Sequence, residues 1–224
     1  MRGFSQADQV LREAAEATQV PGVVAVAATR DGPVYQGAFG KRALPAGAAM
    51  TADTLFWIAS MTKAITSTAA MQLVERGKLA LDRPIQDVLP ELAAAKVLEG
   101  FDAAGEPKLR PARRPITLRH LLTHTAGFAV RPLETAMPPY SNDAEFFPGM
   151  VKKWGLGFMI NTEGVPARRG AGSLAWAGLG NTYFWIDPDE GVAGVILTQL
   201  IPFADSKVLA LFEQFETAVY AALH

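Results

Sequence analysis

The apolar positions at the start of the chain follow a helical period and then gather in two short β-type runs. Residues 5–18 repeat apolar side chains at helical spacing, and Ser5 stands where it can cap the helix. Residues 23–29 and 34–40 are short β-type runs around Asp31-Gly32, a dipeptide typical of hairpin turns. The first part of the chain is therefore predicted to be a helix followed by a β-hairpin.

The middle of the chain is predicted to be helical. Residues 61–76 are rich in Ala and Met with apolar side chains four apart, and Gly77 is a suitable helix stop. A second short helix is expected to start at residues 82–84, and one or two helical turns at 117–123. Residues 100–115 contain three prolines and several charges, so they are expected to form an irregular surface excursion.

The period changes again after residue 148, and strands are expected there. Four runs bounded by Gly, Pro or Asp are predicted as strands: 155–162, 173–178, 181–187 and 191–199. Residues 205–223 are predicted to close the chain as a helix, whose otherwise apolar face includes Glu216.

This order of elements predicts an α+β fold. Sequential strands joined by short turns pair antiparallel, so both chain ends would contribute to one antiparallel sheet with the N- and C-terminal helices on one face. The expected division is a sheet subdomain of residues 1–54 and 150–224 and a helical subdomain of residues 55–149. A cleft between two such subregions is a usual place for a small-molecule site.

Composition excludes several classes of function. The chain has 21 Lys and Arg against 22 Asp and Glu, so no basic excess favours nucleic acid as a partner. It has no Cys, which excludes a thiolate nucleophile and Cys-ligated metal sites. No stretch approaches 18 apolar residues and the N-terminus does not resemble a signal peptide, so neither a membrane partner nor export is expected, and the expected compartment is cytoplasmic.

The strongest candidate chemistry lies in Ser60-Met61-Thr62-Lys63. At the start of a helix, positions i and i+3 share a face, so Ser60 and Lys63 are expected within hydrogen-bond reach. A lysine in a poorly hydrated pocket can take the proton of a serine hydroxyl, and the helix N-terminus favours the oxyanion that forms. An N-cap serine followed by a surface lysine gives the same letters, because Ser-x-x-Lys alone is common.

The flanks of this motif carry a resemblance. FWIASMTKAITSTAAMQLVERGKLALDRPIQDVLPEL, at residues 56–92, resembles the serine-active segment of the class C β-lactamase-like superfamily, and so does ITLRHLLTHTAGF at 116–128. The similarity is closest to the family VIII carboxylesterases. The resemblance implies the fold of serine β-lactamases and D-alanyl-D-alanine carboxypeptidases, with a shortened helical insertion.

A further signature of this family is Lys-Thr-Gly on a strand, often Trp-x-Gly in the esterase branch. Here it corresponds to Trp176-Ala177-Gly178. A glycine on a strand lets a substrate carbonyl approach the backbone closely. The resemblance implies that the N–H groups of Leu179 and Ser60 are the two oxyanion donors.

The remaining signature is Tyr-x-Asn or Tyr-x-Ser, whose tyrosine helps to move the proton. Tyr140-Ser141-Asn142 matches it literally. The surrounding MPPYSNDAEFFPGM, however, resembles a later stretch of the family, so the segment with the family's tyrosine is interpreted as missing between Phe128 and Phe146. Tyr140 as a substitute and Tyr140 as a coincidence both stay open.

The predicted function is that of a serine carboxylesterase on small esters, with Ser60 as nucleophile, Lys63 as base and no cofactor. No metal is expected, because His120 and His124 are four apart but lack the Glu of a zinc motif and a third ligand. An ester is preferred to a β-lactam because the leader of a periplasmic enzyme is missing and Trp176 stands in place of a carboxylate-binding lysine.

Two alternatives remain at this point. One is a catalytically weak or inert shortened relative that acts as a binding or scaffold module; the other is a β-lactamase or D-alanyl-D-alanine peptidase relative. A shortened helical region would expose apolar surface, which favours a homo-oligomer.

Overall fold

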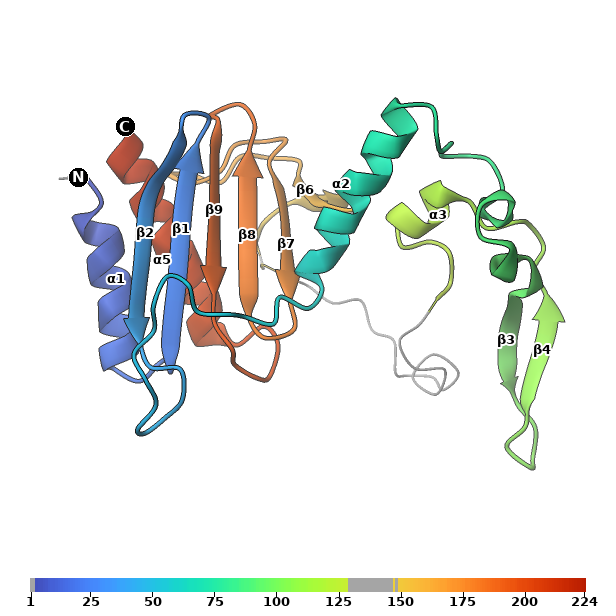
Figure 1. Cartoon of the computed structure of the whole chain (residues 1–224), viewed down its shortest axis with the longest axis horizontal. Helices are drawn as coiled ribbons and strands as arrows, with labels where there is room; N and C mark the ends of the chain where they lie inside the picture. Colours follow the sequence, from blue (N-terminus) through green and yellow to red (C-terminus); the bar gives the residue numbers. More distant parts are fainter. Residues whose placement is uncertain (1–2, 129–146, 148) are drawn as a thin grey trace. The chain divides into compact units, whose positions relative to one another are not determined.

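The computed structural model describes residues 3–128, 147 and 149–224 (Figure 1). The chain separates into two compact units, one of residues 1–65, 146–154 and 158–224, and the other of residues 66–145 and 155–157. The predicted division into 1–54 with 150–224 and 55–149 stays a prediction about domains. Tyr140, and most of the stretch interpreted as shortened, lie outside the described residues.

The first unit is built on an antiparallel sheet, as predicted, and this sheet has seven strands where the sequence predicts six. Its strand order is β2-β1-β9-β8-β7-β6-β5. The strands are β1 (Gly22–Thr29), β2 (Gly32–Gly40), β5 (Lys152–Trp154), β6 (Met159–Asn161), β7 (Leu174–Gly178), β8 (Thr182–Asp187) and β9 (Val192–Leu197). The two chain ends meet where β1 pairs with β9, from Val24 opposite Leu197 to Thr29 opposite Val192.

The terminal helices α1 (Ser5–Glu16) and α5 (Ser206–Leu223) pack against each other and cover one face of the sheet (Figure 1). Their apolar sides join the inward side chains of the strands in one core, which includes Leu11, Phe212 and Trp185. Asp205 caps α5, since its Oδ1 accepts from the N–H groups of Lys207 and Val208.

The prediction that Ser5 caps α1 is wrong. The N-cap position is Phe4, no side chain there bonds the helix, and Ser5 is already the first helical residue. Phe4 instead packs its ring against Tyr35 of β2, with 5.6 Å between ring centroids. The residue at the start of this helix thus contributes an apolar contact and no polar cap.

The second unit holds most of α2 (Met61–Glu75), the 3-10 turns η1 (Ile85–Asp87) and η2 (Pro90–Ala94), the strands β3 (Lys96–Phe101) and β4 (Pro107–Pro111), and the helix α3 (Leu118–Leu122). A small core of Ile85, Leu118 and Leu122 joins the turns to α2 and α3. The expected short helix at residues 82–84 is instead one 3-10 turn that begins at Ile85, with Pro84 as its N-cap.

The irregular excursion expected at residues 100–115 is instead mostly a hairpin, in which β3 pairs antiparallel with β4. Its turn is closed by Asp102, whose Oδ1 accepts from the N–H groups of Ala104 and Glu106, each over 2.9 Å. Pro107 and Pro111 stand at the two ends of β4, where a missing N–H is tolerated.

Candidate active site

Ser60 lies immediately before α2, at the end of a segment without regular structure. Three tight turns wind the chain into the helix: the N–H groups of Met61, Thr62 and Lys63 each donate to the carbonyl three residues earlier, over 3.0–3.1 Å. Ala59 has a φ of +44°, in the left-handed region that side chains other than glycine rarely adopt. The backbone thus turns sharply at the residue before the serine.

Ser60 and Lys63 are brought together as the motif predicts. Lys63 Nζ donates to Ser60 Oγ over 2.9 Å. Met61 and Ala64 point into the protein, which leaves Thr62 and Lys63 on the opposite, exposed side of the first turn. The role of Lys63 as the base stays a prediction.

Gly178, at the end of β7, lies against the segment that precedes Ser60. A Cβ at this position would overlap the carbonyl oxygen of Ile58 and the hydroxyl of Thr182. The glycine is thus required for a close approach of two parts of this chain, while the approach of a substrate carbonyl stays a prediction.

The contact between Ile58 and Gly178 brings Ser60 and Leu179 to one region of the sheet unit, because each lies one or two residues further along its segment. Leu179 is 48 % exposed in the β7–β8 turn. Among the described residues, neither the N–H of Ser60 nor that of Leu179 has a hydrogen-bond acceptor. Two free amide donors near a serine hydroxyl are the donor type that stabilises an oxyanion.

Trp176 is half-buried in β7 and packs edge-on against Trp154 of β5, with 4.4 Å between ring centroids. Two indole rings in this arrangement give a rigid apolar surface at this end of the sheet.

Asn181 is a residue of this region that the sequence reasoning missed. It is fully buried and has a φ of +58° in the β7–β8 turn. Its Nδ2 donates to the carbonyls of Leu200 and Pro202, and its Oδ1 accepts from Tyr183 Oη and Asp205 N, all over 2.7–3.0 Å. The Gly180-Asn181 pair was the available signal, since Asn tolerates the left-handed conformation.

Burial raises the pKa of Tyr183, which keeps its hydroxyl protonated as the donor to Asn181. The turn that carries Leu179 is therefore anchored by the Asn181 side chain, whose hydrogen-bond donors and acceptor are all used.

Gln199 is a second residue of this region that nothing in the sequence pattern singled out.

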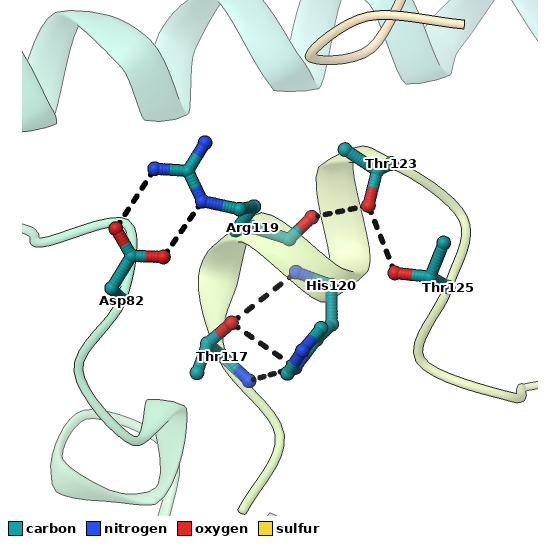
Figure 2. Close-up of polar contacts among 6 residues, drawn as sticks. All are labelled: Asp82, Thr117, Arg119, His120, Thr123 and Thr125. Carbon is teal, nitrogen blue, oxygen red and sulfur yellow. Dashed lines mark hydrogen bonds and ion pairs between the residues drawn. The ribbon is translucent and has the colours of Figure 1, made fainter.

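His120 and His124 belong to the second unit. The His120 side chain contacts Thr117 at the start of α3 (Figure 2). Thr117 and His120 form a reciprocal cap of α3: Thr117 N donates to His120 Nδ1 over 3.1 Å, and His120 N donates to Thr117 Oγ1 over 3.3 Å. Within residues 3–128, 147 and 149–224, no three His, Cys, Asp or Glu side chains are grouped to hold a metal ion.

Arg119 of the same helix holds Asp82 through two hydrogen bonds, of 2.7 and 2.8 Å (Figure 2). These bonds lower the pKa of the Asp82 carboxyl and raise the pKa of the Arg119 guanidinium. Thr123 Oγ1, just after this helix, donates to the Arg119 carbonyl over 2.8 Å (Figure 2).

None of the helices in the described part of the chain has the length and apolar character needed to cross a membrane.

Comparison with known proteins gives relatives among acyltransferases and esterases. The chain is 42 % identical over 134 residues to acyltransferase mokF from Monascus pilosus, a match that covers 57 % of this chain and 32 % of that protein. It is 35 % identical over 178 residues to the lovastatin esterase of Penicillium rubens, covering 76 % of this chain and 44 % of that protein. The chain thus spans less than half the length of these curated relatives.

The fold is that of a solved structure of simvastatin synthase from Aspergillus terreus, with a TM-score of 0.81 at 22 % identity, over 96 % of this chain and 94 % of that one. This confirms the expected β-lactamase/transpeptidase-like fold. The profile of the Beta-lactamase family matches residues 7–146, more than half of the sequence. The chain therefore belongs to the Beta-lactamase family.

Proposed function

We propose that this chain hydrolyses small carboxylic esters through an acyl-enzyme on Ser60. The observation that carries the proposal is the 2.9 Å contact between Lys63 Nζ and Ser60 Oγ at the start of α2. The relatives named above support it, because their names describe either transfer of an acyl group or cleavage of an ester.

In the first step Ser60 Oγ bonds to the ester carbonyl carbon while its proton passes to Lys63 Nζ, which accepts it when the amine is uncharged. The carbonyl oxygen becomes an oxyanion and takes hydrogen bonds from the N–H groups of Ser60 and Leu179. The bond to the alcohol oxygen then breaks, and the alcohol leaves with the proton held by Lys63. Water attacks the acyl-enzyme in the same way and releases the acid.

Tyr140 would share the proton transfers if it replaces the family's tyrosine. Tyr140→Phe decides between the substitute and the coincidence: loss of a group that moves protons costs about 10²–10⁴ in rate. Unchanged turnover in this variant assigns Tyr140 no role in the reaction.

The expected substrate is an ester rather than a β-lactam. Trp176 and Trp154 offer an apolar surface, and no ammonium group stands at the Trp176 position to pair with a β-lactam carboxylate. We therefore expect hydrolysis of p-nitrophenyl acetate and butyrate, and no hydrolysis of a chromogenic cephalosporin. Cephalosporin turnover that exceeds ester turnover supports the β-lactamase alternative.

The test of the mechanism is Ser60→Ala beside Ser5→Ala, a substitution of an exposed serine on α1. Ser60→Ala should lose ester hydrolysis and labelling by a fluorophosphonate, whereas Ser5→Ala keeps both. Full esterase activity in Ser60→Ala overturns the proposal. A folded wild-type protein that the probe does not label supports the alternative of an inert binding or scaffold module.

Acyl transfer to an alcohol is the second candidate, favoured by the 42 % identity to an acyltransferase. It uses the same acyl-enzyme and replaces water with an alcohol acceptor. Product analysis with an added alcohol separates the two, because transfer yields a new ester and hydrolysis yields only the acid.

A further inference from the structure

The side chain of Gln199, just beyond β9, binds the segment that leads into Ser60. Trp57 N donates to Gln199 Oε1 over 3.1 Å, and Gln199 Nε2 donates to Trp57 O over 3.1 Å, although the two residues are 142 positions apart. The carboxamide thus uses both backbone groups of Trp57, as a residue of a neighbouring strand would.

The orientation of this carboxamide is fixed by its own hydrogen bonds. Nε2 has two hydrogens, and the second donates to the Thr198 carbonyl over 2.6 Å. A flipped amide would point Oε1 at two carbonyl oxygens and Nε2 at an N–H group. Only one orientation of Gln199 therefore satisfies Trp57.

The same stretch of chain also holds the turn that carries Leu179. Leu200 N donates to Gly180 O over 3.1 Å, and Thr198 Oγ1 donates to Asn181 O of the same turn over 2.8 Å. A Cβ at Gly180 would come within 2.8 Å of Gln199 Nε2, so this glycine leaves room for the carboxamide. Residues 198–200 thus contact both segments that supply the two free amides.

We propose that Gln199 is a positioning residue for acyl transfer. It holds the N–H of Ser60 where it can donate to the same oxyanion as the N–H of Leu179. This inference rests on the proposed function, because it takes those two amides as the oxyanion donors. Gln199 touches no reacting atom. Without it Trp57 loses both of its backbone partners, and a misplacement of about 1 Å in a catalytic group costs about a hundredfold in rate.

The test compares Gln199→Ala and Gln199→Met with Gln36→Ala, which removes an exposed glutamine of β2. For p-nitrophenyl butyrate we expect kcat to fall about tenfold to a hundredfold in both Gln199 variants with little change in KM, and no change in Gln36→Ala. A wild-type kcat in both Gln199 variants overturns the proposal.

Gln199→Glu adds a pH profile that a merely structural role would not produce. When ionised, the new side chain places a carboxylate oxygen against the carbonyls of Trp57 and Thr198; when protonated, it donates to one of them. The ratio of its kcat to that of wild type should therefore rise as pH falls through the range in which carboxyl groups titrate. A ratio that is flat with pH contradicts the proposal.

Amide hydrogen exchange separates this inference from the proposed function. Exchange of the Trp57 amide, whose N–H donates to Gln199 Oε1, should become faster in Gln199→Ala and Gln199→Met and stay unchanged in Gln36→Ala. Unchanged exchange in the Gln199 variants overturns the inference whatever the activity. If the fluorophosphonate fails to label wild-type Ser60, the proposed function falls, while the exchange result still decides whether Gln199 holds the segment.

Discussion

At the residue scale, both candidate oxyanion donors lie beside a residue other than glycine in the left-handed region. Ala59 precedes Ser60 with a φ of +44°, and Asn181 follows the Leu179-Gly180 turn with a φ of +58°. Such conformations cost on the order of 1–3 kcal/mol and persist only where the surroundings enforce them. Tight turn bonds enforce the first and the buried Asn181 amide enforces the second.

Lys63→Met tests the proposed base. We expect kcat/KM for p-nitrophenyl butyrate to fall by about 10²–10⁴, because the proton of Ser60 then has no side-chain acceptor within 2.9 Å. Lys63→Arg should not restore activity, since a guanidinium stays protonated. The control is Lys78→Met, an exposed lysine beyond the end of α2. Activity of Lys63→Met within twofold of wild type would rule out this role.

The contact between Ser60 and Lys63 was predictable because helix geometry alone brings positions i and i+3 together. The roles of Gly178 and Gln199 as neighbours of the preceding segment were not, because each depends on a partner more than a hundred residues away.

At the element scale, a charged residue on the apolar face of α5 has a structural role. Its apolar face includes Glu216, which is fully buried and accepts from Arg169 N, Nε and Nη2 over 2.8–3.1 Å. Arg169 is also fully buried, and its guanidinium lies over the Phe212 ring. The pair ties the loop between β6 and β7 to the helix.

Glu216→Gln should lower the free energy of unfolding by about 3–5 kcal/mol, because it leaves the buried Arg169 charge without its partner. Urea denaturation measures this change. Glu213→Gln, one turn away in a partly exposed pair with Arg168, should cost at most about 1 kcal/mol. Equal effects of the two variants would refute the role of burial.

We expect the stability of the second unit to depend on pH through Asp82. Its pKa is lowered in the folded state by the hydrogen bonds from Arg119, so its stabilising effect is full above the unfolded value of about 3.9 and is lost as pH falls through the folded value. Asp82→Asn should therefore speed amide exchange in α3 at pH 7, and the difference from wild type should shrink below about pH 4. A difference that grows at acid pH would contradict this assignment.

Helices and strands with a clear period were predictable, including the β1–β2 hairpin and α5. The β3–β4 hairpin was not, because its strands are exposed on most positions and show no apolar alternation. Its prolines indicated a loop, although they stand only at strand ends. The start of α1 at Ser5 was predictable, but its cap was misassigned: the N-cap is Phe4, which packs on Tyr35, a contact that local sequence does not encode.

At the scale of the whole molecule, the two chain ends pair with each other within the sheet unit. β1 and β9 share a ladder of six residue pairs, and α1 packs on α5. The antiparallel sheet with terminal helices on one face was predictable from the order of elements and the short turns between strands. The division into two domains, of residues 1–54 with 150–224 and of residues 55–149, stays a proposal.

A protease site introduced within residues 129–146 tests whether this pairing of the chain ends holds the sheet unit together. After cleavage, the two fragments should still elute together in gel filtration, because the β1–β9 ladder and the shared core join them. They should separate in urea. Separation under native conditions would show that the two chain ends do not hold the sheet together by themselves.

The contact between Ile58 and Gly178 has a consequence for the order of events during synthesis. Ser60 leaves the ribosome long before Gly178, Leu179 and Gln199, yet its backbone setting depends on those later residues. Until β9 emerges, β1 also lacks one of its two neighbours. The nascent chain therefore carries its proposed nucleophile without the groups that would orient it, and the candidate site is assembled only when the last strands arrive.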